Sequence, residues 1–145
     1  MTTMTQAAGT TNGAAGAGTL FGQALLGGAA AAVVNLALFF GAKAAGVAMT
    51  GEFQPGTVGE LMLPAVAISS VVPGLFAALI ALLFQKFTKA PARNFAILAV
   101  AFGLFSLIGP VNVKQISTGT IVVMELMHVV AGVGIGGMLF RALKR

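Results

Sequence analysis

The chain has 145 residues, of which 58% are hydrophobic and 8% are charged, and its mean hydropathy is +1.01. Soluble domains carry about 25% charged residues, so this composition excludes a water-soluble globule and predicts an integral membrane protein. The net charge is +5, but the basic residues flank apolar segments instead of forming one basic face. No nucleic-acid partner is therefore expected.

Cysteine is absent and histidine occurs once. One chain of this composition supplies no disulfide, no thiolate nucleophile, no bis-histidine haem site and no two-histidine metal site. We therefore expect that the chain binds no metal and no cofactor on its own.

The first nineteen residues are mostly Ala, Gly and Thr and contain no charged side chain. They lack the basic and apolar regions of a signal peptide. This composition favours a flexible tail over residues 1–19. The remaining chain, 20–145, is then a single membrane domain.

Four apolar stretches follow, each near the roughly 20 residues that a helix needs to cross the hydrocarbon core. The connection Thr50–Glu60 is short, and Pro55-Gly56 within it predicts a turn. The predicted fold class is all-α, an integral membrane four-helix bundle. Its spans are predicted at 20–49, 61–87, 95–110 and 121–143.

Basic residues orient the bundle, because short loops that are rich in Lys and Arg stay in the cytoplasm. The connection between the second and third spans and the C-terminal end carry six of the eight basic residues: Lys86, Lys89, Arg93, Arg141, Lys144 and Arg145. Both termini are therefore predicted on the cytoplasmic side (N-in/C-in). An even number of spans requires the same.

Small residues spaced four apart mark the faces through which membrane helices approach each other closely. Such faces serve packing within one chain or contact with a second copy. The candidate packing residues are Gly27, Ala31, Ser70, Gly74, Gly103, Gly132 and Gly136.

Polar groups at hydrocarbon depth cost free energy unless they face protein or water, so they are the first candidates for function. Glu125 and His128 lie at i and i+3 in the fourth span, hence on one face. Lys43 reaches the same outer level, and Asn35 lies nearer the midplane, where it is placed to hydrogen-bond across helices. Together with Ser106, these residues predict a polar cluster in the outer half of the bundle.

Two interpretations of this cluster stay open. In one, Glu125 pairs with Lys43 or His128 and only ties helices together; in the other, the cluster binds a solute or relays protons. Glu-x-x-His spacing also occurs in ferritin-like di-iron sites, but these need two such motifs and two further glutamates. The chain has three acids in total. No nucleophile elbow or phosphate-binding loop is present, so we expect no enzyme.

Three short motifs in the second half of the chain are PARNF at 91–95, SLIGP at 106–110 and LMH at 126–128. With Asn35, they make the chain resemble an uncharacterised family of small bacterial four-helix membrane proteins, a domain of unknown function. The resemblance covers about the second to fourth spans and implies a four-span fold in a bacterial membrane. It points to His128, Ser106, Pro110 and Arg93 as positions to test, and it implies no activity.

We predict a non-catalytic small integral membrane protein that is an accessory or structural subunit of a homo-oligomer or a larger membrane complex. Its expected partners are the lipid bilayer and further copies or other membrane subunits. Its expected location is the bacterial cytoplasmic (inner) membrane. The alternative is a small proton or solute channel or transporter that uses the polar cluster around Glu125 and His128.

Overall fold

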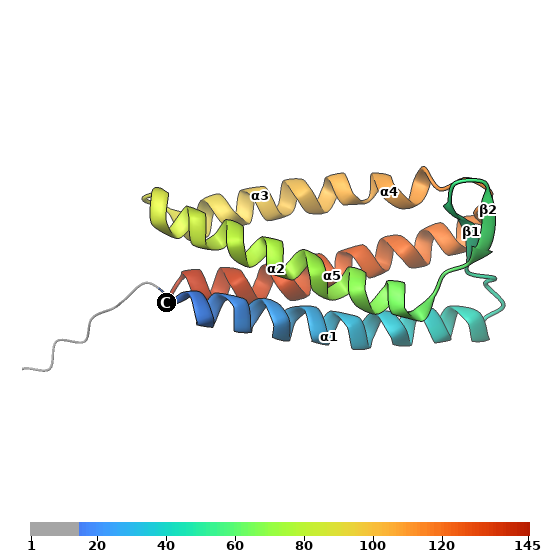
Figure 1. Ribbon diagram of the computed structural model, residues 1–145, viewed down its shortest axis with the longest axis horizontal. Helices are drawn as coiled ribbons and strands as arrows, with labels where there is room; N and C mark the ends of the chain where they lie inside the picture. The colour runs from blue at the N-terminus through green and yellow to red at the C-terminus, as the bar shows by residue number, and fades with distance from the viewer. Residues whose placement is uncertain (1–14) are drawn as a thin grey trace, which may run out of the picture.

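The computed structural model describes residues 15–145, so the first fourteen residues of the predicted tail lie outside the described residues. Within this part, four helical segments are long and apolar enough to cross a membrane. This confirms the predicted all-α four-helix membrane fold. In chain order the elements are α1 (Ala17–Ala44), β1 (Thr50–Gln54), β2 (Thr57–Glu60), α2 (Leu63–Phe87), α3 (Pro91–Ser106), α4 (Ile108–Val111) and α5 (Thr118–Leu143) (Figure 1).

The first helix differs from its prediction at both ends. It begins at Ala17, inside the predicted tail, and ends at Ala44, five residues before the predicted end at 49. Gly46 has a φ of +83°, and its N–H bonds to the carbonyl of Lys43, while the N–H of Val47 bonds to the carbonyl of Ala42. This pair of bonds is the glycine-terminated motif that ends many helices. Gly46 was therefore a stop signal within the apolar run.

The third and fourth spans also begin earlier than predicted. Pro91 occupies the first turn of α3, where its missing N–H costs nothing and its fixed φ suits the helix. The hydroxyl of Ser117 accepts a hydrogen bond of 3.1 Å from the N–H of Thr120 and caps α5. Between the two spans, Pro110 cannot donate an N–H to the carbonyl of Ser106. The helix accordingly breaks at Leu107 into α3 and the short α4.

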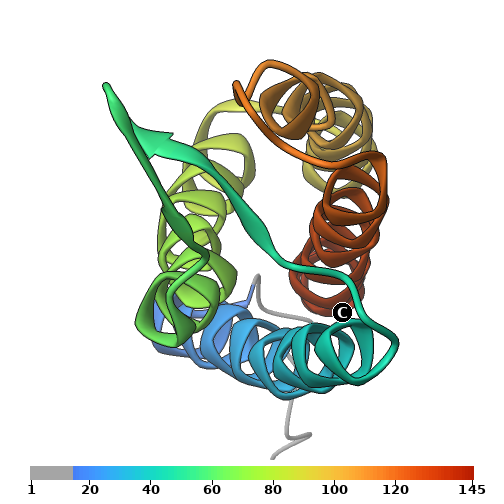
Figure 2. The ribbon, with the colours of Figure 1, turned by 90° about the vertical axis from the view of Figure 1, so that its right-hand side faces the viewer.

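A two-stranded antiparallel hairpin, β1 and β2, occupies the connection between α1 and α2 and was not predicted from the sequence. Its turn lies at Pro55-Gly56, as predicted, and the carboxylate of Glu52 accepts a hydrogen bond from the N–H of Gly56. The N–H of Glu52 also bonds to the carbonyl of Lys114 in the connection before α5. The hairpin therefore lies across one end of the bundle and joins two connections there (Figure 2).

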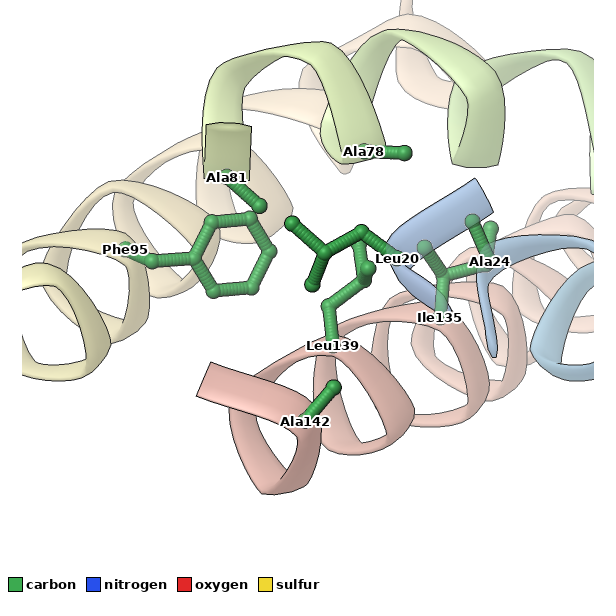
Figure 3. Packing of buried hydrophobic residues seen from close by; sticks show 8 residues of the cluster. All are labelled: Leu20, Ala24, Ala78, Ala81, Phe95, Ile135, Leu139 and Ala142. Atoms are coloured by element: carbon green, nitrogen blue, oxygen red, sulfur yellow. The ribbon is translucent and has the colours of Figure 1, made fainter. Parts of the chain in front are cut away.

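Helix α1 packs against both α2 and α5, and α3 with α4 lies on the opposite side of the bundle from α1 (Figure 2). One apolar cluster fills the end where α1 begins and α5 ends, and it includes Leu20, Phe95 and Leu139 (Figure 3). A second cluster, which includes Phe39, Met49 and Met127, lies at the hairpin end. Helix α2 begins beside α1 near the hairpin and reaches α3 at the opposite end (Figure 1).

Glycines set the closest approaches of these helices. A Cβ atom on Gly27 would lie 2.6 Å from the carbonyl oxygen of Gly134 in α5, and one on Gly74 would lie 3.1 Å from that of Ala24. The neighbouring Gly28 faces α2, where a Cβ would lie 3.0 Å from the carbonyl oxygen of Ser70. Adjacent glycines of α1 thus contact two different helices.

The other candidate packing residues have different surroundings. Ala31 and Ser70 are buried. A Cβ on Gly136 would only touch Ala99 of α3, at 3.9 Å, and Cβ atoms on Gly103 and Gly132 would meet nothing within 4 Å. In α5 the glycine that contacts α1 is therefore Gly134, which the predicted pair Gly132 and Gly136 did not include. The reason is that helix rotation follows from contacts with neighbouring helices.

Candidate functional site

A pocket of about 240 Å³ lies between α1, α2 and α5 in the half of the bundle nearer the hairpin. Its wall takes one residue from α1, residues at and just before the start of α2, and residues from the second to fourth turns of α5. Most of its wall is apolar, with polar atoms contributed by three helices. Its lining residues are Asn35, Leu61, Ala65, Val66, Ser69, Ser70, Met124, Met127, His128 and Ala131.

Asn35 is the central polar residue of the pocket and is 3% exposed. Its side-chain Nδ2 donates to the hydroxyl oxygen of Ser70 in α2 at 2.9 Å and to the carbonyl oxygen of Met127 in α5 at 3.2 Å. Both N–H groups of the amide are therefore used, and each joins α1 to a different helix. Asn35 was expected to hydrogen-bond across helices, and it does so through these two bonds.

The other polar side chains of the pocket also use their donors on backbone carbonyls. The hydroxyls of Ser69 and Ser70 donate to the carbonyl of Val66, at 3.2 and 2.8 Å. The ring Nδ1 of His128 lies 2.7 Å from the carbonyl oxygen of Met124. A carbonyl oxygen only accepts, so Nδ1 carries the proton of this contact, and a ring that is protonated on Nδ1 alone presents Nε2 as an acceptor.

Two acceptor atoms of the pocket residues have no hydrogen-bond partner. The Oδ1 atom of Asn35 is buried and has no hydrogen-bond partner within residues 15–145. Nε2 of His128 likewise makes no hydrogen bond to a described residue. Since a buried polar atom without a partner costs about 1–3 kcal/mol, Oδ1 has a strong preference for an occupant that donates a hydrogen bond.

Pro73 leaves a third acceptor, the backbone carbonyl of Ser69, without a donor in the part of α2 that lines the pocket. Pro73 lies inside α2 and has no N–H to give to the carbonyl of Ser69, four residues earlier. Ser69 lines the pocket and is exposed, so the pocket reaches the molecular surface at this residue. Asn35, Ser69 and the Nδ1-protonated form of His128, three of the lining residues, therefore each have one acceptor atom without a hydrogen-bond partner.

The remaining predicted site residues lie elsewhere. Lys43 at the end of α1 forms an ion pair with Glu60 of β2, on the exposed surface where such pairs add little stability. Glu125 is half-buried and makes no ion pair or hydrogen bond within the described residues. Ser106 donates to the carbonyl of Gly103 within α3. None of the three lines the pocket.

The structure therefore brings Asn35 and His128 together and separates them from Glu125, Lys43 and Ser106. Glu125 and His128 are one turn apart on α5, but only the histidine faces the pocket. Among the described residues, no group of three or more His, Cys, Asp or Glu side chains lies close enough to hold a metal ion.

The predicted polar cluster did not include Met124 or Met127, which line the pocket with Asn35. Ser69, another lining residue, precedes Pro73 by four residues. A hydroxyl residue at that spacing, next to the carbonyl that proline frees, was a signal available in the sequence. Nothing in the sequence was a reason to select the two methionines, because α5 carries apolar residues on all of its faces.

Comparison with known proteins identifies the family but no function. No curated protein and no solved structure matches the chain. Residues 15–145 match a family of unknown function, DUF6069. The match extends the resemblance seen in the second to fourth spans to the whole described chain, α1 with Asn35 included. The chain, with its four candidate membrane helices, therefore belongs to the DUF6069 family, whose function is unknown.

Proposed function

We propose that this protein is a non-catalytic membrane protein that binds a small, neutral, hydrogen-bond-donating solute in the pocket between α1, α2 and α5. The observation that carries this proposal is the set of acceptor atoms without partners among the residues that line the pocket. The unpartnered Oδ1 of Asn35 and the free Nε2 of His128 both need a donor. An alcohol, a phenol or an amide N–H provides one.

The charges near the pocket also limit the net charge of the solute. No carboxylate lines the pocket, because Glu125 lies outside it. An anion would meet these acceptor atoms there, and a full cation would lack a counter-charge in an apolar wall, which is costly. A neutral molecule with an apolar body and one or two donors fits both the wall and its polar atoms.

Phenol and its methyl ether, anisole, form a matched pair of probes, because they share the ring and differ in the donor. The full chain is labelled with ¹³C at its methionine methyl groups and titrated in detergent micelles. We expect phenol to shift the Met124 and Met127 signals saturably, with an affinity roughly tenfold above that of anisole, the difference that one hydrogen bond makes. Met62, which is 59% exposed, reports nonspecific partitioning of both probes into the micelle.

The variant His128→Phe removes Nε2 and keeps an aromatic ring of similar size. We expect it to weaken phenol binding severalfold while the anisole shifts stay as they are. Equal responses of the wild-type pocket to phenol and anisole would show that the acceptors play no part. The absence of any saturable shift with either probe would mean that the pocket holds only water, and the proposal would fail.

A second candidate function, that of a subunit in a membrane assembly, is favoured by two glycines that packing within the chain does not use. Gly103 in α3 and Gly132 in α5 each leave open space where a Cβ would lie. Ala99 of α3 and Gly136 of α5 are in contact. Gly103 is one turn from Ala99, and Gly132 is one turn from Gly136. The two glycines therefore lie on the sides of α3 and α5 that carry this contact. Small residues that leave space are typical of helix interfaces in membranes.

Particle mass tests this second candidate directly. If the open glycines receive a helix of another copy, protein extracted in mild detergent has a mass above that of one chain. Replacing Gly132 by leucine then reduces it to that of one chain, whereas Gly41→Leu, at another open glycine, leaves it unchanged. A wild-type particle of one chain without a copurified protein would refute the assembly.

Under either candidate function we place the protein in the bacterial cytoplasmic membrane with both termini inside, as its distribution of basic residues favours.

A further inference from the structure

We propose that a groove between the start of α3 and the end of α5 binds one anionic phospholipid. The groove has a volume of about 490 Å³ and lies at the end of the bundle opposite the hairpin. It is separate from the pocket described above and shares no residue with it. Its lining residues are Ala90, Pro91, Ala92, Arg93, Ala96, Ile97, Phe140, Leu143 and Lys144.

Two basic side chains supply the charge that a phosphodiester requires. Arg93 comes from the first turn of α3, and Lys144 follows the last turn of α5. The Nζ atom of Lys144 lies 4.7 Å from the centre of the Phe140 ring, which holds the ammonium at the edge of the groove. No acidic residue lines it.

The distribution of charge over the whole chain also favours an anionic ligand at this end of the bundle. All three glutamates of the chain lie away from this end: Glu52 and Glu60 are in the hairpin, and Glu125 is in the hairpin half of α5. Six of the eight basic residues lie at or near this end. Clusters of basic residues beside membrane helices attract anionic lipid headgroups.

The remaining lining residues are apolar, and all except Ala90 belong to candidate membrane-spanning helices. Ala92 and Ala96 are small and leave room beside Ile97, which is 63% exposed, and Phe140. This floor suits an acyl chain, whereas a soluble phosphate would leave it empty. A second copy of the chain would bring its own basic end against this one. The combination of two cations with an apolar floor therefore selects a lipid.

Retention of phosphatidylglycerol by the purified full chain tests the site, with phosphatidylcholine of the same acyl chains as the uncharged reference. Native mass spectrometry from detergent micelles counts the bound lipid. We expect one retained phosphatidylglycerol and no retained phosphatidylcholine. The double variant Arg93→Gln/Lys144→Gln should bind phosphatidylglycerol roughly 30-fold more weakly, the combined contribution of two basic side chains near a membrane.

The double variant Lys89→Gln/Arg145→Gln is the matched control. It removes the same charge from the same end but does not alter the groove, so its affinity should stay within about twofold of wild type. A third variant, Ala96→Leu, keeps every charge and fills the floor, and it should weaken retention severalfold. Glycerol phosphate at millimolar concentration should not displace the lipid.

Four outcomes would overturn the proposal. Equal losses of phosphatidylglycerol affinity in the two double variants would show that the lipid responds to the total charge of this end and not to the groove. Equal retention of phosphatidylcholine would show that Arg93 and Lys144 do not select the headgroup. Displacement by glycerol phosphate, or full retention in Ala96→Leu, would show that the apolar floor is not occupied by an acyl chain.

Discussion

Replacing Gly27 by alanine is expected to lower the free energy of unfolding by about 1–3 kcal/mol, the usual cost of overpacking a tight contact. The new methyl group would lie 2.6 Å from the carbonyl oxygen of Gly134 and 3.0 Å from the Cα of Ile135. These atoms belong to the backbone, so no side-chain rotation relieves the contact, and α1 and α5 must separate. Titration with sodium dodecyl sulfate, followed by circular dichroism, measures the change.

Gly41→Ala is the matched control for this prediction. It lies in the same helix, is exposed, and a Cβ there meets nothing within 4 Å. Alanine is the better helix former by up to about 1 kcal/mol, so this variant should be as stable as wild type or more stable. Equal stabilities of Gly27→Ala and Gly41→Ala would contradict the close approach of α1 and α5.

Replacing Asn35 by leucine is expected to weaken phenol binding roughly tenfold, to the level of anisole, while stability stays within about 1 kcal/mol of wild type or rises. The substitution removes two interhelical hydrogen bonds, which in membranes are worth about 0.6 kcal/mol each. It also removes the unpartnered Oδ1, whose burial costs at least as much. The hydroxyl of Ser70 still donates to Val66, so no new donor is left without a partner. The methionine NMR titration and the detergent titration measure the two effects.

This pair of measurements separates binding from a structural role. A stability loss above about 2 kcal/mol with phenol binding intact would identify Asn35 as a tie between helices and nothing more. Asn112→Leu serves as the control, because this exposed asparagine bonds only within α4, to the carbonyl of Ile108. It should leave phenol binding unchanged.

Hydropathy was sufficient to predict the number of spans, because length and apolar content alone decide whether a helix crosses a membrane. It could not predict how each helix is rotated. In a soluble protein, polar residues mark the outside, but here Val133, Phe102 and Leu26 are exposed and as apolar as the buried Leu139. The outward face of a membrane helix therefore carries no polarity signal.

The glycines of α5 illustrate this limit. Glycine occurs at positions 132, 134, 136 and 137, so small residues face several directions and their spacing fits more than one partner. Only the contact with Gly27 selects Gly134. The same uncertainty in rotation led us to group Glu125 with His128, although they differ in direction by about 60° on a helix of 3.6 residues per turn. The surroundings of Asn35 could be predicted without knowing the rotation of α1, because a polar amide in a membrane costs least free energy when it is buried between helices.

The position of α1 between α2 and α5 has a consequence for biosynthesis. Its two partners are separated in the chain by α3 and α4, so α1 and α2 reach the membrane long before α5 is translated. Until then, the face with Gly27 stays open to lipid, and the second N–H of Asn35 has no acceptor on Met127. A nascent chain that stops before α5 therefore presents an uncovered amide in the bilayer. Translation of α5 therefore supplies the last hydrogen-bond partner of this amide and covers the face with Gly27 in one step.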